Sequence, residues 1–302
     1  MPSTNPVRPS VHDPGSRTAR RIQIRASRLV TGIFAGEYRS AFRGRGIEFD
    51  EVRDYQPGDD IRSIDWNVTA RLDRPFVKRF VEERELTLLI LLDRSASMDF
   101  GTLRATKGET AAELTALLAF AAFRSNDRVG LITYTDRVDT CMPPAKGKRH
   151  VLGLVRQALE PVSAGKAADL SAVLEHVRRV TKGRALLFII SDFLCEVPVP
   201  QLAALAGRHE VIAVSVSDPA EHQLPAAGLL QLRDAETGAL CLVDTGSEKV
   251  RRSYRLRASE RQAGLKSLLT SAGAELLTVD TRIPPLHPLV RFFKNRLRHR
   301  IG

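Results

Sequence analysis

The feature that most constrains the fold is a series of short apolar runs separated by stretches of helical periodicity. Residues 86–92, 129–135, 185–190 and 211–216 are almost continuously apolar, as strands are when helices cover both faces of a parallel sheet. Helices are expected at 104–124, 149–159, 170–180 and 254–271, and a last strand at 274–279. This alternation predicts an α/β fold with a doubly wound, mostly parallel sheet.

One part of the chain departs from that alternation. Two apolar runs, 229–232 and 240–243, flank the turn-forming residues 234–238. Two strand-like runs around a short polar segment that contains glycine are typical of a β-hairpin. We therefore expect a β-hairpin insertion in the α/β domain.

The chain divides into four regions by composition. Residues 1–16 are rich in proline and predict a disordered lead, and residues 17–85 form an N-terminal segment. The α/β domain spans 86–281, and a basic C-terminal tail covers 282–302. Residues 76–85 enter the first strand without a glycine or proline, so we expect residues 44–85 to pack on the sheet.

Composition indicates a folded protein of 302 residues, 43% of them hydrophobic. No apolar run approaches the roughly 20 residues that cross a bilayer, so a cytoplasmic protein without a transmembrane segment is expected. The three cysteines, Cys141, Cys195 and Cys241, have no ligand-like spacing. They are expected to be buried, reduced thiols, and Cys195 and Cys241 to have no functional role.

The net charge of +11 is concentrated at the two ends of the chain. Residues 1–45 contain nine arginines against two acids, and residues 282–302 contain six basic residues and no acid, which leaves the middle slightly negative. A near-neutral body without interleaved aromatic and basic residues argues against nucleic-acid binding. The basic ends could contact acidic surfaces or a membrane, or could simply be solvated.

Polar side chains follow two of the expected strands directly. Asp93, Ser95 and Ser97 come after the run 86–92, and Asp192 comes after the run 185–190. Ligands of open parallel sheets bind at the carboxyl ends of the strands, and oxygen groups of this kind suit Mg²⁺ or Mn²⁺. Asp169 could contribute from further out, although capping of the helix that follows it is the simpler interpretation.

No complete catalytic set accompanies these residues. An aspartyl phosphotransferase would need a second acid where Ser95 stands, and neither a G-x-S-x-G motif nor a phosphate-binding GxxxxGK[ST] loop is present. The prediction is therefore a protein without enzymatic activity. A metal-dependent hydrolase or phosphatase that uses the Asp93 edge is the alternative.

The D-x-S-x-S pattern of Asp93, Ser95 and Ser97 resembles the metal-ion-dependent adhesion site of von Willebrand factor A domains. The resemblance implies a doubly wound fold in which Mg²⁺ binds an acidic side chain of another protein. Asp192 matches the final aspartate of that site, but Ala168 stands where a threonine ligand is expected. The resemblance then implies weak metal binding, which Ala168→Thr should tighten.

A second resemblance covers more of the chain, residues 36–295. The string R-x-Y-x-P-G-D-D-x-R-x-I-D-W at 53–66, followed by TAR at 69–71, is similar to the signature of the bacterial family called domain of unknown function 58. The resemblance implies a role beside a MoxR-type AAA+ ATPase in assembling, inserting a cofactor into, or remodelling other proteins. The signature could be a bracket of salt-bridged turns, or a partner surface that includes Trp66, Arg62 and Arg71.

Overall fold

A six-stranded sheet forms the centre of the computed structural model, which describes residues 26, 30, 33–43, 51–57, 59, 64, 66–72, 74–79, 85–160 and 167–301. From one edge to the other the strands are β10 (Glu275–Asp280), β7 (Glu210–Ser217), β6 (Leu186–Ser191), β3 (Thr87–Asp93), β4 (Arg128–Tyr134) and β5 (Val138–Ala145). Neighbours are parallel except β4 and β5. The chain starts inside the sheet at β3 and winds outward in both directions, which confirms the predicted doubly wound fold.

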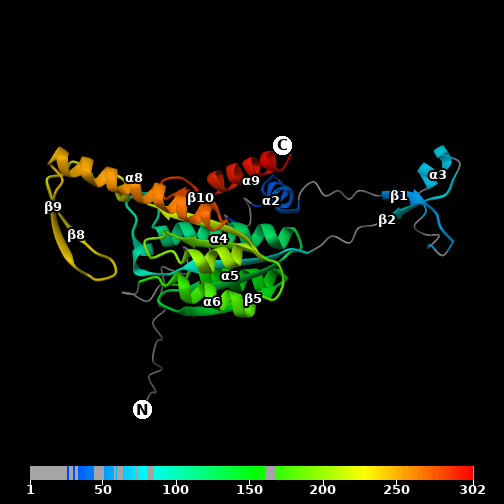
Figure 1. Ribbon diagram of the computed structural model, residues 1–302, viewed down its shortest axis with the longest axis horizontal. Helices are drawn as coiled ribbons and strands as arrows, with labels where there is room; N and C mark the ends of the chain where they lie inside the picture. The colour runs from blue at the N-terminus through cyan, green and yellow to red at the C-terminus, as the bar shows by residue number, and fades with distance from the viewer. Residues whose placement is uncertain are drawn as a thin grey trace, which may run out of the picture.

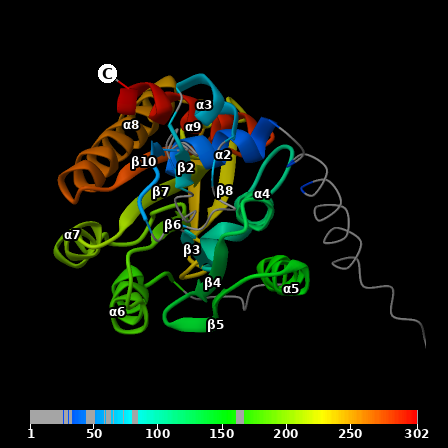
Figure 2. The same ribbon diagram turned by 90° about the vertical axis from the view of Figure 1, so that its right-hand side faces the viewer.

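Helices cover both faces of this sheet, and each face has its own apolar core (Figures 1 and 2). One face carries α2 (Ile33–Arg43), α4 (Lys107–Arg124), α5 (Lys148–Ala158) and α9 (Leu286–Ile301). The other carries α6 (Leu170–Val180), α7 (Val199–Ala206) and α8 (Glu248–Ser271). Covered on both faces, the inner strand β3 is buried from Leu88 to Asp93, which explains its continuous apolar sequence.

The start of α4 is fixed by a capping box. The Thr106 hydroxyl accepts the Glu109 N–H, and the Glu109 carboxylate accepts the Thr106 N–H. Such a reciprocal pair satisfies two N–H groups that the first turn would otherwise leave unpaired. Lys107, the first residue of α4, is therefore held at a defined place beside the end of β3.

Strand β5 and helix α7 of the α/β domain were not predicted from the sequence. Edge strand β5 alternates between more and less exposed residues and contains Pro143 and Pro144, a composition tolerated only at the edge of a sheet. Helix α7 lies between Pro198 and Gly207. Neither segment has the continuous apolar character that revealed the inner strands.

The predicted basic tail is wrong for residues 286–301, because they form helix α9. Leu289 and Phe293 are buried, and the Phe293 ring contacts the rings of Phe34, Tyr38 and Phe42 on α2. The five arginine and lysine residues of this helix concealed its single apolar stripe. This helix is part of the core of its face of the sheet.

Some of the basic groups of α9 pair with acids of the same chain. Arg296 forms ion pairs with Glu210 of β7 and, at 2.5 Å, with Glu275 of β10. Lys294 lies 3.9 Å from Glu37 of α2. These pairs join α9 to the sheet and to α2, so part of the C-terminal charge serves the fold.

The family-signature segment forms a small unit of its own. Strands β1 (Glu51–Asp54) and β2 (Phe76–Arg79) pair antiparallel, and α3 (Trp66–Leu72) lies between them in the chain. The Phe76 N–H donates to the Thr69 hydroxyl, and the Tyr55 N–H donates to the Pro75 carbonyl. Figure 1 shows this unit apart from the main sheet, contrary to the predicted packing.

The predicted hairpin is confirmed by β8 (Leu229–Arg233) and β9 (Leu240–Asp244), which pair antiparallel. Figure 1 shows it projecting from the body of the domain next to α8. Two short 3₁₀ helices, η2 (Ala96–Asp99) and η3 (Pro219–Glu221), follow β3 and β7. The predicted disordered lead, residues 1–16, lies outside the described residues.

Candidate functional site

The carboxyl ends of β3 and β6 bring the predicted site residues together. The two strands are parallel neighbours with Leu92 opposite Ile190, so the residues that follow them lie at the same edge. Asp93, Ser95, Ser97 and Asp192 are all buried there. The four residues therefore share the edge that the sequence predicted for them, and their role as metal ligands stays a prediction.

Both carboxylate oxygens of Asp93 accept hydrogen bonds from the protein. The Ser95 N–H donates to Oδ1 at 2.8 Å, and the Ser191 hydroxyl donates to Oδ2 at 2.6 Å. The hydroxyl oxygens of Ser95 and Ser97 lie 3.1 Å apart and share a hydrogen bond. Burial raises the pKa of Asp93 to about 6, although the Ser191 hydrogen bond opposes this, and the nearby charge of Asp192 adds to the rise.

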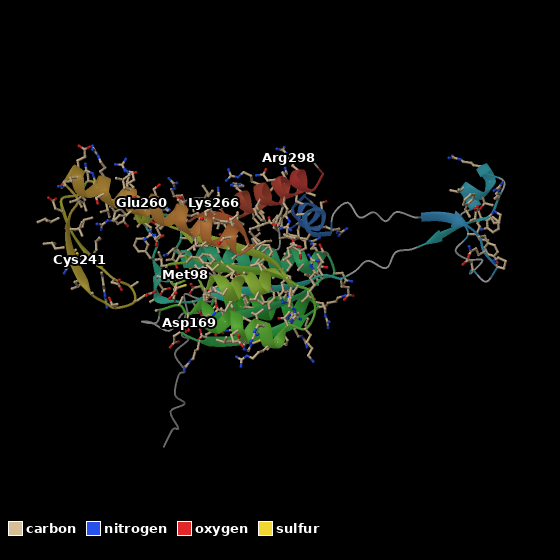
Figure 3. All side chains as sticks on the ribbon, viewed as in Figure 1. Met98, Asp169, Cys241, Glu260, Lys266 and Arg298 are labelled. Atoms are coloured by element: carbon tan, nitrogen blue, oxygen red, sulfur yellow. The ribbon has the colours of Figure 1, made fainter. Side chains whose placement is uncertain are left out.

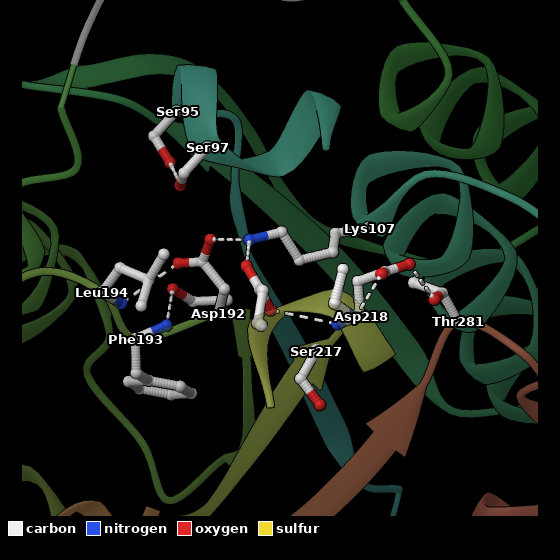
Figure 4. A network of polar contacts seen from close by, with 12 residues as sticks. Ser95, Ser97, Lys107, Asp192, Phe193, Leu194, Ser217, Asp218 and Thr281 are labelled. Carbon is white, nitrogen blue, oxygen red and sulfur yellow. Dashed lines mark hydrogen bonds and ion pairs between the residues drawn. The ribbon is translucent and has the colours of Figure 1, made fainter. Parts of the chain in front are cut away.

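A lysine that the sequence analysis did not single out lies at the centre of this edge. The ammonium group of Lys107 is 2.6 Å from Oδ2 of Asp192 and 2.5 Å from Oε1 of Glu221 (Figure 4). It also lies over the Phe100 ring, 5.9 Å from the ring centre. Lys107 is fully buried, so this is a lysine held between two carboxylates inside the protein.

The second carboxylate, Glu221, is fixed by its own contacts. Its Oε2 accepts the Asp218 N–H at 3.0 Å within a capping box around η3. Asp218 is buried in turn and accepts the hydroxyls of Thr102 and Thr281 at 2.6 and 2.7 Å. The segments that follow β3, β7 and β10 are thereby tied together beneath Lys107.

These contacts do not fit a divalent cation. Oδ2 of Asp192 bonds the Lys107 ammonium, Oδ1 accepts the Leu194 N–H at 3.1 Å, and both oxygens of Asp93 are also hydrogen-bonded. Ala168 supplies no hydroxyl and packs against the apolar core.

The remaining predicted residues lie elsewhere. Asp169 is the N-cap of α6 and accepts the Ala172 N–H at 3.2 Å, so its capping interpretation is confirmed. Trp66 and Arg71 are exposed on α3, and Arg62 lies outside the described residues. Figure 1 shows α3 in the unit apart from the main sheet, so the sequence-predicted residues form two separate groups.

The prediction that all three cysteines are buried is wrong. Cys141 and Cys241 are exposed, because each stands on a strand at an edge or in the projecting hairpin. Cys195 is partly buried close to the site, where burial and then the charge of Asp93 raise the pKa of its thiol to about 12. A thiol in that state is a poor nucleophile.

One signal for the missed lysine is present in the sequence. Helix N-termini favour acidic residues because of the helix dipole, yet Lys107 opens α4 directly after the D-x-S-x-S loop. Glu221 carries no comparable signal. It meets Lys107 across 114 positions of sequence, and only the folded sheet reveals the pair.

Comparison with known proteins settles the family. The family model described as "Protein of unknown function DUF58" matches residues 51–264. The chain belongs to this family. The resemblance inferred from the string at 53–71 is therefore confirmed.

Several relatives are bacterial proteins. The chain is 32% identical to "Uncharacterized protein Rv1480" of Mycobacterium tuberculosis over 97% of this chain and 93% of that protein. It is 27% identical to "Uncharacterized protein YeaD" of Bacillus subtilis over 37% of this chain and 28% of that protein. None of these names assigns an activity.

Solved structures with a similar arrangement include conserved hypothetical protein BatB from Bacteroides thetaiotaomicron. It has a TM-score of 0.45 and 18% identity, and covers 70% of this chain and 99% of its own. The SpRpn10 VWA domain has a TM-score of 0.40 and 13% identity, over 69% and 95%. Within the described residues of the present chain, none of the helices has the length and apolar character of a membrane span.

Proposed function

We propose that this chain is a non-enzymatic protein-interaction module that works with a MoxR-type AAA+ ATPase in the assembly or remodelling of other proteins. The ATPase comes from the family resemblance described above. The interaction role has separate support in hairpin β8–β9. Cytoplasmic location stays a prediction.

The observation that carries the proposal is an exposed row of leucines on this hairpin. Leu229, Leu240 and Leu242 are 66%, 63% and 67% exposed. Leu242 lies opposite Gln231, two residues after Leu229, and paired residues share a face, so the three leucines lie on one face of the hairpin. Exposed apolar groups gathered on one projecting element are typical of protein-binding surfaces.

The hairpin is also close to the polar edge of the sheet. Burial raises the pKa of Glu236, in the hairpin turn, and the charge of Asp192 raises it further, whereas Lys107 lowers it. Figure 1 shows the hairpin bending back toward the main sheet. Figure 3 shows Cys241 on the projecting hairpin and Met98 at the adjacent end of the domain. A partner on this side of the molecule would meet both features.

A binding measurement with the purified MoxR-type ATPase of the same organism tests the proposal. We expect the full chain to bind the ATPase, and the double variant Leu229→Ser, Leu242→Ser to bind at least about tenfold more weakly. Val180→Ser is the matched control, because Val180 is an exposed apolar residue at the other end of the sheet, where α6 ends.

Two results would contradict this proposal in different ways. If the full chain does not bind the ATPase with ATP or ADP present, the ATPase is not the partner. If the leucine variant and the Val180 variant bind equally well, the hairpin is not the contact surface. Circular dichroism of each variant confirms that the domain is folded.

The hydrolase or phosphatase alternative has less support from the site. Asp93 is hydrogen-bonded through both oxygens, and Asp192 is neutralised by Lys107. A phosphoester screen with Mg²⁺, with Asp93→Ala beside the unaltered chain, tests it. Activity that depends on Asp93 would favour the alternative.

A further inference from the structure

We propose that Lys107 is a built-in cation that replaces the divalent ion at the edge of this sheet, so that the edge is assembled without Mg²⁺ or Mn²⁺. The inference concerns which positive charge balances the carboxylates at this edge. It does not depend on the ATPase partner. The edge can lack a metal ion whether or not the hairpin binds a protein, and the hairpin can bind a protein whether or not the edge holds a metal ion.

The first support is the position of the ammonium group. Lys107 contacts Asp192, the residue that the adhesion-site pattern assigns to the metal, at 2.6 Å. Its side chain is 1% exposed and that of Asp192 is 3% exposed. An ion pair so fully withdrawn from water is maintained only when both charges are present.

The second support is the second carboxylate. Glu221 takes another N–H of the ammonium at 2.5 Å and is itself oriented by the Asp218 N–H. An ammonium group has three donors and no acceptor, so a lysine can join two carboxylates as a metal ion would. Glu221 belongs to no part of the D-x-S-x-S pattern, and its second carboxylate oxygen, which the η3 cap does not use, pairs with Lys107.

The third support is the place of Lys107 on its helix. The amino end of a helix carries a partial positive charge, which disfavours a lysine there, and burial disfavours any unpaired ammonium. Both effects oppose a charged Lys107 as the first residue of α4. The pairing with Asp192 and Glu221 compensates both, so the residue is explained by its partners and not by helix preference.

A divalent cation at Asp192 would have to displace or closely approach this ammonium. Like charges repel strongly inside a protein, where water screens them little. Ala168 offers no hydroxyl that could hold the ion in a displaced position. The Lys107 ammonium therefore already supplies the positive charge at this edge that a metal ion would supply.

The test measures Mn²⁺ binding by the loss of the free-ion electron paramagnetic resonance signal, and thermal unfolding with MgCl₂ or with EDTA. For the unaltered chain we expect no Mn²⁺ binding at millimolar concentrations and the same unfolding temperature in both solutions. Mn²⁺ binding that Asp93→Ala removes would overturn the proposal.

Substitution of the lysine provides the converse test. Lys107→Met removes the charge and leaves an unbranched side chain one atom shorter, and should create Mn²⁺ binding at least tenfold tighter than in the unaltered chain, with stabilisation by Mg²⁺. The double variant Lys107→Met, Glu221→Gln leaves one buried carboxylate fewer without a partner than the single variant does. It replaces the single variant in this test if the single variant does not fold. A folded variant that gains no Mn²⁺ binding overturns the proposal.

Arg104→Met is the matched control. Arg104 forms a neighbouring ion pair with Glu113 at 3.0 Å, so its loss also removes a cation beside α4, but away from Asp192. We expect it to gain no Mn²⁺ binding. A gain equal to that of Lys107→Met would show that any lost positive charge has this effect, and would overturn the specific role of Lys107. If neither lysine variant folds, Mn²⁺ binding by the unaltered chain alone decides the question.

Discussion

Replacement of Phe293 by alanine tests whether the C-terminal helix is structural. Phe293 is fully buried and lies against Phe34 at 5.6 Å between ring centres, Tyr38 at 6.0 Å and Phe42 at 5.2 Å. These contacts join α9 to α2 over the sheet. If α9 were a solvated tail, as the six basic residues of 282–302 suggested, the substitution would have almost no effect on stability.

The expected loss follows from the buried area. An aromatic side chain buries about 150–250 Å², which at about 25 cal/mol per Å² corresponds to roughly 4–6 kcal/mol as an upper limit. Alanine retains part of this, and measured Phe→Ala losses in cores are about 3–5 kcal/mol. The three ring contacts place Phe293→Ala at the upper end of that range.

Urea unfolding followed by far-ultraviolet circular dichroism measures the loss. Trp66 fluorescence is unsuitable, because Trp66 stands on α3, outside the main sheet. Asn295→Ala is the control, since Asn295 is an exposed residue of the same helix, and should change the free energy of unfolding by less than about 0.5 kcal/mol. Equal, small effects of the two substitutions would refute the packing argument.

Three further outcomes are expected. Burial alone would raise the pKa of Asp218, but hydrogen bonds from two threonine hydroxyls and two backbone N–H groups lower it below its usual value. The ionised form therefore stabilises the fold above the unfolded pKa of about 3.9, and this contribution is lost as the pH falls through the folded value. Asp218→Asn should accordingly lose about 1.5–3 kcal/mol at neutral pH, and less near pH 3, in urea titrations at both pH values; a loss independent of pH would contradict this assignment. A thiol reagent at pH 8 should label Cys241 rapidly and Cys195 only after unfolding, because burial raises the pKa of Cys195 to about 12; fast native labelling of Cys195 would be the contrary result. Thr106→Ala should lower the free energy of unfolding by about 1 kcal/mol through loss of the α4 cap, and Thr106→Ser should restore most of it; an Ala variant as stable as the Ser variant would show that the cap is dispensable.

The inner sheet could be predicted because a strand that is buried on both faces has a continuous run of apolar residues in the sequence. Each inner strand must be apolar at every position, and the run from Leu88 to Leu92 shows this directly. Strand β5 is covered less completely, so its alternation and its prolines resemble a loop. Helix α9 needs only a narrow apolar stripe, and the count of basic residues concealed it. Local sequence therefore predicts an element in proportion to how completely it is buried.

The site could be predicted only in part for a related reason. Asp93, Ser95 and Ser97 are neighbours in the chain, and Asp192 has the same relation to its strand, so a rule about strand ends finds them. Lys107 and Glu221 are joined to the site by contacts over 85 and 114 positions. Only the order of strands in the sheet brings these residues together, and no local pattern contains that information.

Ala168 and Lys107 then have one explanation instead of two. A threonine hydroxyl at position 168 would serve as a ligand only if a metal ion were held beside Asp192, and the Lys107 ammonium bonds that carboxylate instead. With the positive charge supplied by the chain, the position is free to pack against the apolar core, as Ala168 does. Addition of the hydroxyl alone would leave the ammonium in place, and removal of the ammonium alone would leave the ion one ligand short. We therefore infer that the two positions affect metal binding jointly. Lys107 has the larger effect, because its ammonium group repels the ion whichever residue stands at position 168.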